Sequence, residues 1–181
     1  MITNRRDLLQ ELTNYQSAYK EEIIFCTRFL ELLRQDRCYH RDHLPGHLTG
    51  SAFIIDHERR YTLLTHHAKL NKWLQPGGHA DGDENIAGVA LREAQEETGV
   101  LNFVFLQTNI FDIDIHQIPA RKDFPEHLHY DVRFLLEASR DEKLIITEES
   151  HDLRWVDLDD VETLVHHSPA MMRMVEKARL L

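Results

Sequence analysis

The chain has 181 residues, of which 42% are hydrophobic and 29% are charged, which suits one globular domain of ordinary size with an appendage. Its formal net charge of −10 removes the attraction on which binding to a nucleic-acid backbone depends, although metal ions can still bridge an acidic protein to a phosphorylated small molecule. No apolar run approaches the roughly 18 residues that span a bilayer, the N-terminus lacks a signal-peptide core, and the two cysteines form no zinc or redox motif. We therefore expect a cytoplasmic protein with reduced thiols and with neither nucleic acid nor a membrane as a partner.

Residues 4–35 are predicted to form one long helix or two shorter ones. Apolar side chains recur there every three or four positions and form a stripe of Leu8, Leu12, Tyr15, Tyr19, Ile23, Cys26, Leu30 and Leu33. Asn4 can cap the first turn, and Ser17 starts a second helix if the segment bends. We expect the stripe to pack on the main domain; the alternative, a subunit interface, would make the protein a homodimer. The chain thus divides into an N-terminal helical extension, 1–45, and a main domain with C-terminal helices, 46–181.

Strands are predicted in the segment that follows. Histidines, proline and glycine mark residues 39–50 as a loop, and β-rich runs at 51–55 and 61–65 come after it. A further strand around Trp73 leads into a Pro-Gly-Gly turn at Pro76–Gly78, a sequence that a regular strand or helix tolerates poorly.

Residues 85–98 are predicted to form an amphipathic helix. Its apolar positions make a narrow stripe for packing against a sheet, formed by Ala87, Ala90, Leu91 and Ala94. Gly99 supplies the left-handed residue that commonly ends a helix. Glu93, Glu96 and Glu97 are spaced i, i+3 and i+4, so three carboxylates share one patch even though each like-charge pair costs a few tenths of a kcal/mol.

Two later strands carry matched polar rows. After a short strand at 103–105, the strand at 110–116 points Asp112, Asp114 and His116 to one face. A proline-containing connection, 117–126, joins it to a strand at 127–136, whose polar row is His127, His129, Asp131 and Arg133. If the two strands pair as neighbours, both rows share one face of the sheet.

The C-terminal part is predicted to contain one strand and two helices. The strand covers 153–156, and Asp157 caps a helix at 158–166. Ser168 and Pro169 then begin the final helix as its cap and first-turn proline.

One spaced pattern links the turn and the acidic helix. It consists of Gly78, Glu84, Arg92, Glu93, Glu96, Glu97, Gly99 and Val100. Every defined position of the 23-residue Nudix box is filled between Gly78 and Val100, and the chain resembles the Nudix hydrolase superfamily. The resemblance implies an α/β fold of the Nudix type, an α/β/α sandwich with a mixed sheet. It also implies a metal-dependent pyrophosphohydrolase that acts on a phosphoanhydride bond in a nucleoside diphosphate derivative.

The resemblance further implies Mg²⁺, or Mn²⁺ in its place, bound by the box. Glu93, Glu96 and Glu97 are the expected ligands, and the carbonyl group of Gly78 is an additional one. Hard cations take oxygen ligands, so a carboxylate cluster suits them. Such ions neutralise phosphate oxygens and activate water, and their binding would relieve the repulsion within the cluster.

The other box residues receive supporting roles. Arg92 has a planar guanidinium group that can hold a neighbouring carboxylate in position. Glu84 is expected to support the metal site through water, and Glu93 has orientation of water as an alternative role. For the general base outside the box, Glu148 and Glu149 are the candidates, with Glu149 preferred; the alternative reading of both is an exposed acidic loop.

The 13 histidines form a second group of interest. His79 occupies a variable position of the box and is a candidate to face the substrate. The polar rows contribute groups with the chemistry of a zinc or other transition-metal site, namely His116, His127, His129 and Asp131. A polar row facing the substrate and a solvated or internally hydrogen-bonded face are the alternatives.

Two other function classes compete with the hydrolase. A catalytically silent Nudix-fold sensor of a nucleotide derivative is one, but it has no need of an intact carboxylate cluster. An isomerase of isoprenoid diphosphates is the other, but it requires an active-site cysteine, whereas Cys26 and Cys38 precede the catalytic domain. No accessory motif chooses among ADP-ribose, dinucleotides, coenzyme A derivatives and nucleoside triphosphates as substrate.

Overall fold

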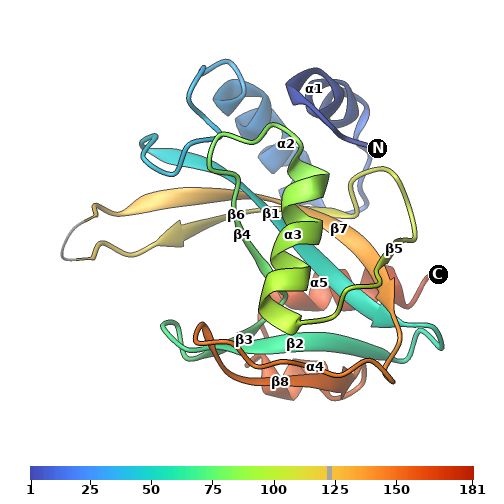
Figure 1. Ribbon diagram of the computed structural model, residues 1–181. Helices are drawn as coiled ribbons and strands as arrows, with labels where there is room; N and C mark the ends of the chain where they lie inside the picture. Colours follow the sequence, from blue (N-terminus) through green and yellow to red (C-terminus); the bar gives the residue numbers. More distant parts are fainter. Residues whose placement is uncertain (122–123) are drawn as a thin grey trace.

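The computed structural model describes residues 1–121 and 124–181, and its strands form one eight-stranded mixed sheet (Figure 1). The main path of the sheet runs through β3 (Lys72–Leu74), β2 (Tyr61–His67), β1 (Gly46–Asp56), β7 (His127–Ala138) and β5 (Val104–Phe105). Three further strands pair with members of this path: β4 (Gly77–His79) with β1, β6 (Asp112–Ile118) with β7, and β8 (Ser150–Asp157) with β2. The predicted connection at 117–126 contains residues 122–123, which lie outside the described residues.

The parallel pair β1–β7 forms the centre of the sheet, with Gly46 opposite Leu128 and Asp56 opposite Ala138. Every residue of β1 is buried, and helices cover both faces of its apolar second half. On one face, Ile54 contributes to the core beneath α3 (Ile86–Thr98). On the other, Phe53 packs with α4 (Val161–Leu164) and α5 (Pro169–Ala178). Figure 1 shows α3 and α5 on opposite sides of the strands, as expected for an α/β/α sandwich with a mixed sheet.

The N-terminal segment forms two helices, α1 (Arg5–Asn14) and α2 (Lys20–Leu32). Their apolar side chains, including Leu8 and Phe29, join the core on the α3 side of the sheet. The stripe predicted for this segment is wrong at Ile23, which is 56% exposed. The break between the helices changes their phase, so α2 turns Glu22 inward instead.

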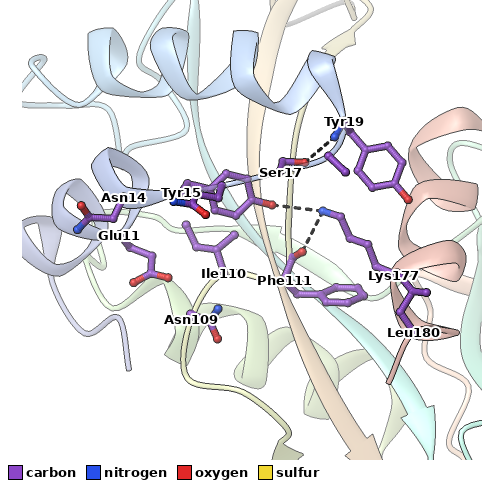
Figure 2. Close-up of a pocket in the computed structure, with 12 residues that line it drawn as sticks. Glu11, Asn14, Tyr15, Ser17, Tyr19, Asn109, Ile110, Phe111, Lys177 and Leu180 are labelled. Carbon is purple, nitrogen blue, oxygen red and sulfur yellow. Dashed lines mark hydrogen bonds between the residues drawn. The ribbon is translucent and has the colours of Figure 1, made fainter.

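Burial of Glu22 is compensated by hydrogen bonds at a junction between α2, the start of β6 and α5, where Figure 2 shows Lys177 bonded to Tyr15 and Phe111. Glu22 accepts from the ammonium group of Lys177 at 2.6 Å and from the hydroxyl of Tyr15 at 2.8 Å. The same ammonium group donates to the carbonyl of Phe111 at 3.0 Å. A pocket of about 410 Å³ lies at this junction, and two of its lining residues, Tyr15 and Lys177, make contacts that hold the N-terminal helices to the main domain.

Two predicted boundaries are wrong because glycine allows backbones to approach closely. Strand β1 begins at Gly46, within the predicted loop 39–50. The predicted turn at Pro76–Gly78 contains the start of β4, which pairs with β1. A Cβ atom on Gly77 would lie 2.1 Å from the hydroxyl of Ser51, so only glycine lets β4 pack against β1 at this point.

The helix that follows β8 is shorter than predicted. Asp157 accepts from the amide of Asp159 at 3.1 Å and so forms a turn, and α4 begins only after Asp160. By contrast, α3 has the predicted ends: Asn85 accepts from the amide of Gly88 at its start, and Gly99 has a φ of 73° at its end. None of the helices within the described residues is both long and apolar enough to cross a membrane.

Candidate active site

A cleft of about 2100 Å³ opens where the polar half of the sheet meets the acidic end of α3. Its walls include Ser51 on β1, His129 and Asp131 on β7, and Glu97 on α3. Ser51, His129 and Asp131 belong to the part of β1 and β7 that precedes the apolar halves of these strands. The same two strands therefore supply core residues under α5 and polar residues in the cleft.

The box carboxylates line this cleft and pack directly against β4. Glu97 is only 8% exposed, and its carboxylate accepts from the amide of Gly77 at 3.0 Å. A Cβ atom on Gly78 would lie 2.4 Å from the carboxyl carbon of Glu93, so the glycine makes room for the acid. Burial raises the pKa of Glu97 to about 8 and also raises the pKa of Glu93, with neighbouring carboxylates adding to both effects.

Arg92 connects these acids to the backbone of β4. Its guanidinium group lies 2.7 Å from a carboxylate oxygen of Glu93 and 3.1 Å from one of Glu96. It also donates to the carbonyl of His79 at 3.2 Å. The side chain therefore holds α3 and β4 in register and neutralises part of the acidic patch.

Of the two supporting acids predicted from the sequence, Glu149 lies in the cleft and Glu84 lies outside it. Glu84 does not line the cleft; it forms an ion pair of 3.1 Å with Arg5 and accepts from the amide of the same residue. The structure therefore places Glu84 in the contact with the N-terminal helices, apart from Glu93 and Glu97. Glu149 is exposed and lines the cleft, and its charge contributes to the raised pKa values of Glu93 and Glu97.

A second acidic group extends from the cleft wall into the protein, and each of its acids contacts a cation. Arg133 is 4% exposed and lies 2.8 Å from Asp131, 3.0 Å from Asp112 and 3.2 Å from Asp114. Arg173 of α5 adds a contact of 2.7 Å to Asp112. Burial alone would raise the pKa values of Asp112 and Asp114, but hydrogen bonds with Arg173 and His116 respectively, together with the charges of the two arginines, hold both pKa values below the ordinary range.

The predicted sharing of one face by the β6 and β7 polar rows is confirmed, since His116 lies opposite His129 and Asp114 opposite Asp131. Asp131 nevertheless does not join the histidines: it accepts from the hydroxyl of Ser51 at 2.7 Å and belongs to the Arg133 network. His116 is drawn to Asp114, with its Nδ1 3.1 Å from the carboxylate.

His47 joins His127 and His129 in the histidine cluster, where Asp131 and His116 had been predicted. It stands on β1 opposite His129, with ring centroids 5.0 Å apart. Sequence reasoning missed this residue because it assigned 39–50 to a loop. The alternation of His47, Thr49 and Ser51 with Leu48, Gly50 and Ala52 is the signal that extends the strand.

The oxygen-rich cluster fits a hard divalent cation. Its donors are carboxylates and backbone carbonyls, which are the ligands that magnesium takes in proteins. Within residues 1–121 and 124–181, the structure shows no cationic side chain paired with the carboxylate of Glu97. A buried acid without a counter-charge is unfavourable, and a bound cation would supply that charge.

Comparison with known proteins places the chain in a family. The NUDIX domain model matches residues 46–176. A probable DHNTP pyrophosphohydrolase of Lactococcus lactis is 26% identical over 138 residues, which cover 75% of this chain and 81% of the relative. The asymmetrical bis(5'-nucleosyl)-tetraphosphatase of Rattus norvegicus is 30% identical over 101 residues, covering 55% of this chain and 65% of the relative. Among solved structures, a NUDIX-family hydrolase of Clostridium perfringens aligns with a TM-score of 0.56 and 25% identity, over 74% of this chain and 97% of that one.

The fold and the carboxylate-lined cleft are thus those of a Nudix hydrolase. This chain belongs to the NUDIX family, because the family model matches well over half of its length. The family match and the pyrophosphohydrolase relatives confirm the predicted enzyme class, a Nudix-type pyrophosphohydrolase.

Proposed function

We propose that this enzyme requires a divalent metal, Mg²⁺ or Mn²⁺, and cleaves the pyrophosphate bond of a nucleoside diphosphate derivative. The observation that carries the proposal is Glu97, a buried carboxylate directed at the cleft with a raised pKa. Glu93, Glu96, Glu97 and the carbonyl of Gly78 would hold the cation. Bound there, it would supply positive charge to the phosphate oxygens of the substrate.

The surrounding residues have separable tasks in this proposal. Arg92 keeps the carboxylates in position, because it contacts both Glu93 and Glu96. A carboxylate oxygen of Glu149 accepts the proton of the attacking water in this proposal, because the residue is exposed in the cleft and its charge contributes to the raised pKa values of Glu93 and Glu97. Glu84 supports the site only indirectly, by joining the segment before α3 to Arg5.

The cleft also has surfaces for the rest of a nucleotide. The ring of Trp73 stacks on His66, with centroids 5.0 Å apart and planes at 14°, and the guanidinium group of Arg154 lies 4.6 Å from the same ring, so these side chains form an aromatic and cationic wall of the cleft. Lys69 and Lys72 line the same cleft and can approach phosphate groups.

We also propose a cytoplasmic location, supported by the free thiols of Cys26 and Cys38.

A substrate panel tests this proposal. It contains ADP-ribose, a dinucleoside tetraphosphate, DHNTP, a coenzyme A derivative and nucleoside triphosphates, each with Mg²⁺, with Mn²⁺ or with a chelator. We expect turnover of at least one compound with metal and loss of turnover with chelator. Undiminished turnover in chelator contradicts the metal requirement. Binding of a panel member with no turnover under any condition favours the silent sensor.

A further inference from the structure

Three histidines on the central strands face one another inside the cleft. One ring nitrogen from each of His47, His127 and His129 lies within 4.8 Å of those of the other two. The ring centroids are 5.0 Å apart for both pairs that include His47, and 5.2 Å apart for His127 and His129. Because all three residues stand on the buried pair β1–β7, their relative positions are fixed by the hydrogen bonds of the sheet.

The tautomers of two of these rings are set by backbone carbonyl groups. Nδ1 of His127 lies 2.9 Å from the carbonyl of Pro125, and Nδ1 of His47 lies 3.3 Å from the carbonyl of His43. A carbonyl oxygen only accepts, so in both rings Nδ1 donates and Nε2 keeps its lone pair. A histidine that binds a metal usually has this arrangement, with its other ring N–H donated to a carbonyl or carboxylate.

Two Nε2 atoms of the cluster are buried and have no hydrogen-bond partner. Within the described part of the chain, Nε2 of His47 and Nε2 of His129 have no hydrogen-bond partner, and His47 is only 1% exposed. A neutral imidazole with an unshared ring nitrogen is the form in which histidine binds a metal. Buried polar atoms are normally satisfied, which indicates that a ligand belongs here.

We propose that His47, His127 and His129 form a second metal site, separate from the carboxylate cluster, for a transition metal of the zinc class. Imidazole nitrogens favour Zn²⁺, Co²⁺ and Ni²⁺ over Mg²⁺, whereas the box offers only oxygen ligands. The ring of His79 lies 5.2 Å from His47 and 4.9 Å from His129, so it can approach as a fourth ligand. A tetrahedral ion with nitrogens at about 2.1 Å would draw the rings closer together.

This site goes beyond the proposed pyrophosphate cleavage, which needs none of the three histidines. The two sites are neighbours through β4: Gly77 and Gly78 contact the box acids, and the next residue, His79, faces the histidines. Each site can nevertheless be removed by itself, because His47, His127 and His129 are not ligands of the carboxylate site.

The experiment measures zinc bound by the double variant Glu96→Gln, Glu97→Gln, in which the oxygen site is disabled. We expect one zinc ion per chain by elemental analysis after equilibrium dialysis against zinc, with Mg²⁺ in excess. Adding His129→Ala should abolish this binding. Adding His57→Ala, which removes a side chain that is 91% exposed, should leave it intact. Circular dichroism checks that each variant is folded.

A second measurement needs no change to the histidines. Cobalt alone is added to the same double variant, and the exchangeable Nδ1–H signals of His47 and His127 are followed by nuclear magnetic resonance. We expect both signals to shift strongly at one equivalent of cobalt, together with the visible absorption of a tetrahedral cobalt centre. Absence of bound zinc from the folded double variant would overturn the proposal. So would unshifted histidine signals, or zinc retained in a folded variant that carries His129→Ala.

Discussion

The Nudix box and the Arg133 network both contain buried carboxylates, but only those of the Arg133 network are surrounded by cationic side chains. Asp112 contacts Arg133, Arg173 and Lys177, and its pKa is held below the ordinary range. Glu97 is also buried, but the structure shows no cation beside it within the described residues, and its pKa is raised to about 8. Burial alone opposes the charge of both acids, so the difference comes from the cations.

This contrast separates a structural role from a proposed catalytic role. Where the protein supplies its own cations, the acids stabilise the packing of β6, β7 and α5. Where it leaves acids without a full counter-charge, folding is less favourable and a charge from outside can bind. The following variants test the contrast, from the largest expected effect to the smallest.

Deletion of residues 1–36 is expected to have the largest effect on stability. It removes Glu22, the buried acid that pairs with Lys177 at 2.6 Å, and exposes the apolar surface covered by Leu8 and Phe29. Thermal unfolding and solubility measurements should show a lower melting temperature and more aggregation. A truncated protein as stable and soluble as the parent would show that the N-terminal helices are dispensable.

Glu97→Gln should lower turnover by about 10³-fold while leaving the fold intact. Glutamine keeps an oxygen that accepts from the amide of Gly77, but it lacks the charge that a cation requires. Turnover at limiting Mg²⁺ and the melting temperature are measured together. Glu31→Gln, an exposed change on α2 away from the cleft, serves as the matched control. Wild-type turnover in Glu97→Gln would contradict its assignment as a ligand, and Glu96→Gln is predicted to behave in the same way.

Asp112→Asn should lower stability by about 3 kcal/mol, because it removes the charge of a buried carboxylate that contacts Arg133, Arg173 and Lys177. Because the folded-state pKa of Asp112 is depressed, its contribution is fully present above the unfolded pKa of about 4 and is lost as pH falls below it. Denaturant unfolding between pH 7 and pH 3 should therefore show a weaker acid dependence in the variant. An equal dependence of the unfolding free energy on pH in the two proteins would contradict the role given to Asp112.

Arg92→Lys should have the smallest effect, a loss of turnover of about tenfold. Lysine keeps the positive charge near Glu93 and Glu96 but cannot also donate to the carbonyl of His79 in the same plane. The rate is compared with that of Arg34→Lys, a change at an exposed residue just after α2. An unchanged rate in Arg92→Lys would exclude a positioning role.

The parts of the molecule that depend on local sequence were predictable. The α3 helix follows from its apolar spacing, and its ends from Asn85 and Gly99, since caps act within one turn. The common face of β6 and β7 followed from alternation. The carboxylate cluster needed only helical periodicity, because all three acids stand on one helix.

Contacts between distant segments were not predictable in the same way. Glu84 fits the box pattern, but Arg5, 79 residues away, determines its partner. Asp131 has the right alternation to accompany the histidines, yet Arg133 and two hydroxyl groups from β1 bind it. His47 could be grouped with β7 only once the β1–β7 register was known. Which partner a polar group takes is thus decided by tertiary packing.

The parallel register of β1 and β7 also couples ligand binding to folding. It joins Thr49 to Asp131, 82 residues later, so the chain must close a long loop before these strands meet. The histidine cluster exists only after that pairing, because His47 comes from one strand and His127 and His129 from the other. A metal bound there would therefore stabilise the whole sheet against unfolding. The hydrogen exchange of amide protons throughout β1 and β7 would be slower as a result.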